Sequence, residues 1–116
     1  MDILKKYVKL SSRVALYVPG TIDINHATDT GAWVATIQSA FAEMFGGATA
    51  SAAAGYWMSE QVNLVSEDVT IVYSYSDTET LKTAIHKVLA LAHEMKTALR
   101  QEAVSLEVNG SLYFIE

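Results

Sequence analysis

The stretch Val69-Thr-Ile-Val-Tyr-Ser-Tyr75 decides the fold, because it runs without a linker into an amphipathic segment that ends near Arg100. A run of β-branched and aromatic residues of this kind is typical of a strand. Ser76, followed three residues later by Glu79, predicts a capping box at the start of a helix. A strand that passes directly into a long helix indicates an α+β sandwich and argues against a helical bundle or a barrel.

The composition narrows the class of protein. The chain has 116 residues, which fits a single domain over 1–116, with 1–11 as a peripheral N-terminal segment. The absence of cysteine excludes disulfides, thiolate zinc sites and iron–sulfur clusters within the chain. A net charge of -5 argues against a nucleic-acid partner, since binding to phosphates needs a basic surface. No apolar stretch approaches the ~20 residues that span a bilayer. No secretory signal is evident, so a cytoplasmic location without membrane contact is expected.

The first half of the chain predicts a strand, a helix and a second strand. Val14–Val18 is the first strand, and Pro19-Gly20 ends it. A loop follows over residues 21–29, with Thr28 or Asp29 as the cap of the next helix. The helix covers residues 30–45 and ends at Gly46-Gly47, and its large apolar residues recur at helical spacing: Trp33, Val34, Ile37, Phe41, Met44 and Phe45. Residues 48–58 are predicted as a strand, and residues 1–9 as either a short helix or an extra edge strand.

The second half predicts a hairpin partner, a helix and a final hairpin. Residues 64–75 return antiparallel to the preceding strand. The second helix carries a continuous apolar seam of Leu81, Ile85, Val88, Leu89, Ala92, Met95 and Leu99. Residues 103–108 form a strand, Asn109-Gly110 is a strong hairpin signal, and residues 111–115 return beside it. The order strand, helix, hairpin, helix, strand is the ferredoxin-like split βαβ sandwich with one added C-terminal strand, and its two helices cover one face of an antiparallel sheet.

The other face of the sheet is the open question. In residues 67–75 the even positions, Asp68, Thr70, Val72 and Ser74, are mixed enough to face water, which would direct the odd positions toward the helices. Even so, the aromatic residues are too numerous for one small core. We therefore expect part of the sheet or its rim to pack against a second copy, giving a homodimer.

Several side chains are candidates for ligand or partner contact. His26 lies in a loop with Asp23 and Asp29, where proton transfer or cation binding competes with simple turn formation. Glu67, Glu102 and Glu107 lie in or beside strands, and edge charges that discourage aggregation are the favoured interpretation. The aromatic candidates are Tyr17, Trp57, Tyr73, Tyr75 and Tyr113, which would serve core and dimer packing or line a ligand cavity.

Five segments resemble those of a group of small bacterial and mobile-element proteins without an assigned activity. The segments are Leu16-Tyr-Val-Pro19, Phe45-Gly-Gly-Ala-Thr49, Gly55-Tyr-Trp57, Val72-Tyr-Ser-Tyr75 and residues 101–110. The resemblance implies a phage or mobile-element setting but no reaction. It directs attention to residues in or beside these segments, namely Tyr17, Thr49, Trp57, Glu67, Tyr73, Gln101 and Glu102.

No stretch carries a phosphate loop, a nucleophile elbow or a metal-binding helix motif. Missing catalytic patterns and abundant tyrosine lead us to expect a non-catalytic binding module that captures a protein partner or a small ligand, without a cofactor or metal. In a mobile-element setting it would inhibit host defence. The alternative is a small enzyme of the dimeric α+β barrel type, an isomerase or monooxygenase, with Tyr73, Glu67 and His26 in an aromatic-lined cavity.

Overall fold

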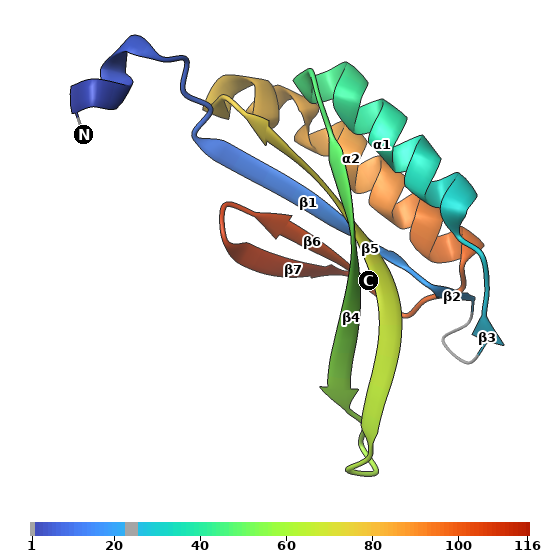
Figure 1. Ribbon diagram of the computed structural model, residues 1–116. Coiled ribbons are helices and arrows are strands. Elements are labelled where there is room, and N and C mark those ends of the chain that lie inside the picture. The colour runs from blue at the N-terminus through green and yellow to red at the C-terminus, as the bar shows by residue number, and fades with distance from the viewer. Residues whose placement is uncertain (1, 23–25) are drawn as a thin grey trace.

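The computed structural model describes residues 2–22 and 26–116. Over these residues the main sheet has five antiparallel strands and two helices cover one of its faces (Figure 1). The strands are β1 (Ser12–Pro19), β4 (Thr49–Met58), β5 (Leu64–Ser76), β6 (Val104–Val108) and β7 (Ser111–Ile115). The helices are α1 (Gly31–Phe45) and α2 (Thr78–Ala98). Three short elements complete the chain: η1 (Asp2–Lys6), β2 (Thr21–Ile22) and β3 (His26–Ala27).

The strand order confirms the predicted α+β sandwich. The spatial order is β4-β5-β1-β6-β7, so the first strand lies at the centre. The connection through α1 passes from β1 over β5 to β4, and the connection through α2 passes from β5 over β1 to β6. Without β7 this is the order of a ferredoxin-like sheet, and β7 is the added C-terminal strand at one edge. The β4–β5 hairpin extends well beyond the helices, as Figure 1 shows.

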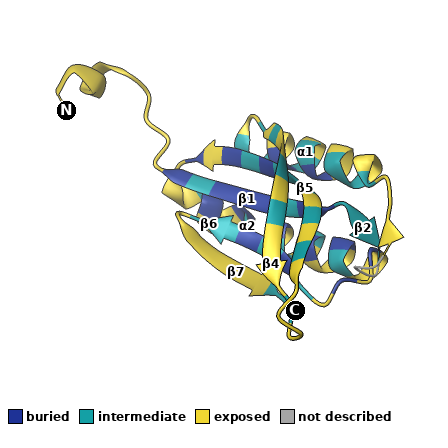
Figure 2. Ribbon diagram, turned by 60° about the horizontal axis from the view of Figure 1, so that its bottom comes forward, coloured by how far each residue is buried: buried dark blue, intermediate teal, exposed yellow. Residues whose placement is uncertain are grey.

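The core lies between the helices and the sheet. The β1 side chains at Val14, Leu16 and Val18 are fully buried, and they meet the apolar stripe of α1 at Ile37 and Phe41. The seam of α2 packs against the same layer, as its spacing predicted, through Leu81, Val88, Ala92, Met95 and Leu99. Figure 2 shows the result as a band of buried residues along β1, while β7 and the far end of β4 stay exposed.

The prediction for the two sides of β5 was wrong. The even positions face the helices: Val72 is fully buried and Ser74 is only 3% exposed. The odd positions face the open side of the sheet, and there Tyr75 is 50% exposed. Register explains the assignment, because Leu16 of the core pairs with Val72 while Ala15 pairs with Tyr73. Ser74 tolerates burial because its hydroxyl donates a 2.6 Å hydrogen bond to the carbonyl of Gly47.

The turns predicted from the local sequence are confirmed, whereas the predicted N-terminal cap of α2 is wrong. Asn109 and Gly110 both have positive φ, 51° and 85°, as a tight hairpin turn requires. Gly46 ends α1 in the left-handed conformation. The cap of α2, however, is Asp77 and not Ser76, since the Asp77 carboxylate accepts the backbone N–H of Thr80 at 2.8 Å. The predicted capping box is therefore wrong by one residue.

The entry to α1 also differs from the prediction. The N-cap residue is Thr30, whose hydroxyl donates to the carbonyl of Pro19 at 2.7 Å and caps no helix amide. Asp29 instead accepts the amide of Gly31 at 2.8 Å. The predicted loop over 21–29 contains the short β2–β3 pair, in which Thr21 lies opposite Ala27. Asp23 and Asn25 lie outside the described residues.

The segment 2–11 leaves the body of the molecule before β1 begins (Figure 1). Its short helix η1 agrees with the helical alternative for residues 1–9, and every residue from 2 to 11 is exposed. Across residues 2–22 and 26–116, no helix combines the length and apolar character needed to cross a membrane.

Candidate functional site

Five polar and aromatic side chains from three strands gather on the open face of the sheet. They are Arg13 and Tyr17 of β1, Tyr73 and Tyr75 of β5, and Glu107 of β6. Strand register brings them together, since Arg13 pairs with Tyr75 while Ala15 pairs with both Tyr73 and Glu107. We call these five residues the open-face cluster.

Arg13 is the centre of the open-face cluster. Its guanidinium carbon lies 4.2 Å from the centroid of the Tyr73 ring and 5.8 Å from that of Tyr75. Its Nε lies 3.3 Å from a carboxylate oxygen of Glu107. The hydrogen bond to the Tyr75 hydroxyl, 3.4 Å long, and the nearby charge of Glu107 raise the pKa of Arg13 above its ordinary value. The guanidinium therefore has a ring face, a hydroxyl and a carboxylate as partners.

The remaining members complete a wall around this ion pair. Tyr73 and Tyr75 meet edge to face, with ring centroids 6.2 Å apart and planes at 88°. The hydroxyl of Tyr17 donates a long hydrogen bond of 3.5 Å to the second oxygen of Glu107. The Arg13 side chain is 32% exposed and that of Glu107 23%, so the cluster is partly desolvated and still open to a ligand.

A second polar group lies at the other end of the same β5 strand. The hydroxyl of Thr21 donates to the Glu67 carboxylate at 3.1 Å, and the Gln101 amide donates to the Thr21 carbonyl at 3.2 Å. Gln101 is only 8% exposed, and it also donates to the carbonyl of Leu99. Glu67 and Tyr73 are six residues apart on one strand and share a face, which corresponds to about 20 Å. The open face thus carries a carboxylate near each end.

Three other predicted site residues are not members of the open-face cluster. Trp57 lies far out on β4, where it pairs with Val65 near the tip of the hairpin. His26 of β3 is exposed, and Asp23, which the sequence places in the same loop, lies outside the described residues. Glu102 is an exposed residue between α2 and β6. Tyr73 and Glu67 lie about 20 Å apart along β5, so the expected convergence of Tyr73, Glu67 and His26 is not seen among the described side chains.

The sequence did not predict Arg13 as a site residue, and Glu107 was assigned no role in the site. Glu107 was predicted to be an edge charge, and that is wrong because β6 lies between β1 and β7 in the sheet. Arg13 carried one usable signal: it lies four residues before Tyr17 in a strand, and residues an even number apart share a face. Its partners at 73, 75 and 107 could not be inferred without the register.

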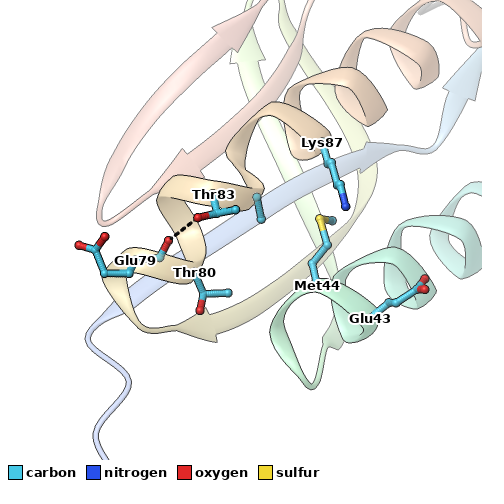
Figure 3. Close-up of a pocket in the computed structure, with 7 residues that line it drawn as sticks. Glu43, Met44, Glu79, Thr80, Thr83 and Lys87 are labelled. Carbon is cyan, nitrogen blue, oxygen red and sulfur yellow. Dashed lines mark hydrogen bonds between the residues drawn. The ribbon is translucent and has the colours of Figure 1, made fainter.

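The helical side of the molecule offers a different concavity. A shallow groove runs between the end of α1 and the first turns of α2, lined by Glu43, Met44, Glu79, Thr80, Thr83, Ala84 and Lys87 (Figure 3). The carboxylates of Glu43 and Glu79 point away from each other there, and Glu79 pairs with Lys82 at 3.6 Å. No aromatic ring lines this groove. We therefore place the candidate site on the open face.

Metal chemistry has no obvious centre in the part of the chain that the structure describes, where no three His, Cys, Asp or Glu side chains gather. The cluster instead offers aromatic faces, carboxylates and one guanidinium. These groups suit an organic ligand that combines positive charge with an aromatic ring.

Comparison with known proteins adds one kind of match. No protein-family profile and no curated protein matches the chain. Two solved structures share its fold: a phage SAM lyase in complex with S-methyl-5'-thioadenosine, with a TM-score of 0.67 at 19% identity, and a phage SAM lyase in its apo state, with a TM-score of 0.66 at 20% identity. The alignments cover 97% and 94% of this chain and 94% of each lyase chain.

These neighbours correct the functional prediction. The non-catalytic binding module and the preference against an enzyme are both wrong as leading interpretations, since enzymes share this fold over nearly its whole length. The error had a definite source: we took the absence of short catalytic motifs as evidence against catalysis. A site assembled from single residues on three strands leaves no such motif.

Proposed function

We propose that this protein is a lyase that cleaves S-adenosylmethionine and releases S-methyl-5'-thioadenosine. The observation that carries the proposal is the shared fold with two phage SAM lyases, one of them holding that nucleoside, over 97% and 94% of this chain. The open-face cluster supports it independently, because its groups complement a substrate with a purine ring, a sulfonium and an ammonium.

The proposed reaction requires no covalent bond between the protein and its substrate. The bond between the sulfonium sulfur and the four-carbon chain breaks, and its electron pair stays on sulfur as the neutral thioether. The four-carbon fragment is completed without addition of water, either by attack of its own carboxylate to form a lactone or by loss of a proton to a carboxylate of the site to form an unsaturated amino acid. Because the positive charge on sulfur decreases as the bond breaks, a partly desolvated surface favours cleavage.

The chain's residues have separable roles in this scheme. Rings at Tyr17, Tyr73 and Tyr75 would contact the purine and the sulfonium. The Glu107 carboxylate, and Glu67 at the other end of the face, would bind the ammonium or the ribose hydroxyls. The net charge of -5 also favours approach of a substrate that carries one net positive charge.

We propose further that the active form is a homo-oligomer. Small-molecule sites usually bury most of their ligand, whereas the cluster lies on an open sheet surface. Large apolar side chains continue from it across the same face at Leu112 and Phe114, which are 49% and 66% exposed. A second copy laid on this face would supply the missing wall and cover these side chains.

The direct test is conversion of S-adenosylmethionine followed by mass spectrometry. The purified protein should release S-methyl-5'-thioadenosine faster than the spontaneous breakdown in a heat-denatured control. The mass of the four-carbon product then separates a lactone from an unsaturated amino acid. Release no faster than in that control would refute the lyase proposal.

Two matched variants locate the site. Glu107→Gln and Glu67→Gln should each lower kcat/KM at least about tenfold, which corresponds to about 1.4 kcal/mol of transition-state stabilisation. Glu94→Gln, an exposed change on the helical side, should leave the rate unchanged. Equal kcat/KM values for all three variants would mean that the reaction does not take place on the open face.

A further inference from the structure

Arg13 holds the position in the open-face cluster that is best suited to a cation. Its guanidinium lies over the Tyr73 ring at 4.2 Å and contacts Glu107 at 3.3 Å. Two tyrosine rings at nearly right angles and one carboxylate make a partial cage, a geometry that binds organic cations in proteins. In this chain, the cage already contains a cation from its own sequence.

We propose that Tyr73, Tyr75 and Glu107 form a binding site for a weakly hydrated organic cation, a sulfonium or a quaternary ammonium, and that Arg13 occupies this site until a ligand displaces it. Arg13 is then an internal competitor. The sulfonium form of the proposal rests on the proposed function, whereas the cation site itself rests on the geometry of these four side chains alone.

The competition has a physical direction. Arg13 gains an ion pair with Glu107 and a hydrogen bond to Tyr75 that a sulfonium, which has no N–H, cannot form. A simple cation should therefore fail to displace it. A ligand with a purine ring brings additional contacts and can succeed. The Arg13 side chain is already 32% exposed, and the long stem of an arginine allows its guanidinium to move into solvent.

Removing Arg13 changes the balance sharply. The Glu107 carboxylate, whose side chain is 23% exposed beside Arg13, would lose its counterion and keep only the long hydrogen bond from Tyr17, and the face of the Tyr73 ring that Arg13 covers would become accessible. A carboxylate in this position binds a cation strongly because its own hydration is incomplete. The Arg13→Ala variant should therefore bind small organic cations that the wild-type protein ignores.

The experiment is an NMR titration with tetramethylammonium chloride at constant ionic strength, with tert-butanol as a neutral probe of similar bulk. Arg13→Ala should bind tetramethylammonium at least about fivefold more tightly than the wild-type protein does, with shifts at the Tyr73 and Tyr75 ring protons. The Arg13→Ala variant should bind tert-butanol no more tightly than the wild-type protein does. Adding Tyr73→Leu to Arg13→Ala should abolish the binding.

The matched control is Lys82→Ala. It also removes a lysine or arginine partner from a carboxylate, Glu79, but on an exposed helix surface away from the rings of the cluster. It should bind no tetramethylammonium. Should Arg13→Ala fail to fold, Arg13→Gln is shorter, uncharged and still able to donate to Glu107, and it tests the same point.

Three results would overturn the cation site: no binding by either Arg13 variant, equal binding by the wild-type protein, or binding that survives Tyr73→Leu. The test needs no turnover, so its failure is distinct from failure of the lyase proposal. Release of S-methyl-5'-thioadenosine without cation binding would support the lyase proposal and refute the cation site. Cation binding without that release would support the cation site and refute the lyase proposal.

Discussion

The two faces of the central sheet are built from neighbouring residues and have opposite characters. On the covered face, Val14, Leu16 and Val72 are fully buried beneath α1 and α2. The open face is formed by the adjacent residues of the same strands, and there the Arg13 guanidinium lies over the Tyr73 ring. The difference shows that, among the described residues, the sheet's side of the core contains no aromatic side chain. The tyrosines of β1 and β5 are thereby available for contacts outside the fold.

The largest expected effect separates the two faces by stability. Phe41 is fully buried and meets Phe45 edge to face at 5.5 Å, so Phe41→Ala should lower the free energy of unfolding by about 3–5 kcal/mol. Phe114 lies on the open face and is 66% exposed in the single chain, so Phe114→Ala should cost less than about 0.5 kcal/mol at a protein concentration low enough to populate single chains. Urea denaturation of the two variants at that concentration makes the measurement. Similar losses under these conditions would contradict the assignment of Phe114 to an open face of the single chain, whereas a loss that grows with protein concentration would show that a second copy covers it.

The proposed homo-oligomer requires that the open face be buried in solution, and sedimentation velocity at micromolar protein concentration tests this. The wild-type protein should sediment as a multiple of the 12.6 kDa chain. The double variant Leu112→Ser, Phe114→Ser should shift toward the single chain, because both side chains lie on the open face. Lys82→Ser, a change on the helical side, should leave the distribution unchanged. A wild-type protein that sediments only as a single chain at micromolar concentration contradicts the oligomer.

The smallest expected effect concerns the attachment of α2 to the covered face. Hydrogen bonds from the backbone and hydroxyl of Thr80 lower the pKa of Asp77 below its ordinary value of 3.8. Since the folded-state pKa is the lower one, the carboxylate's contribution is complete above pH 3.8 and is lost as the pH falls through the folded-state value. Asp77→Ala should therefore be less stable than the wild-type protein at neutral pH.

The difference between these two proteins should shrink on acidification below the ordinary pKa of Asp77. Thermal denaturation at neutral and acidic pH measures it, and Asp29→Ala at the entry of α1 serves as a comparison. A gap that stays constant with pH would mean that Asp77 stabilises the helix through its shape and not its charge.

Local sequence signals determined most of the fold. The apolar spacing of α1 and α2, the glycine at 46 and the Asn109-Gly110 turn each act within a few residues, and the structure bears them out. Strand and helix order then left few topologies, so the ferredoxin-like arrangement followed. The one-residue error at the cap of α2 has the same local origin, because Ser76 and Asp77 are both good capping residues and only the backbone geometry chooses between them.

The candidate site was a different matter. Glu67, Gln101, Tyr17, Tyr73 and Tyr75 were named from the sequence, but nothing in it could say that Tyr73 meets Arg13 and Glu107. The face of β5 was misjudged because tyrosine is compatible with both core and surface, and a slip of one residue in register exchanges the two.

The sequence by itself determined the main helices and strands to within about two residues at their ends, since propensity, capping and periodicity depend on neighbours along the chain. Only the tertiary structure decided which side of each strand meets the helices, because that choice depends on pairing between residues as far apart as 13 and 107. The open-face cluster exists through that pairing alone. Its residues come from three strands and meet because of strand register, which is set by pairing across the whole sheet.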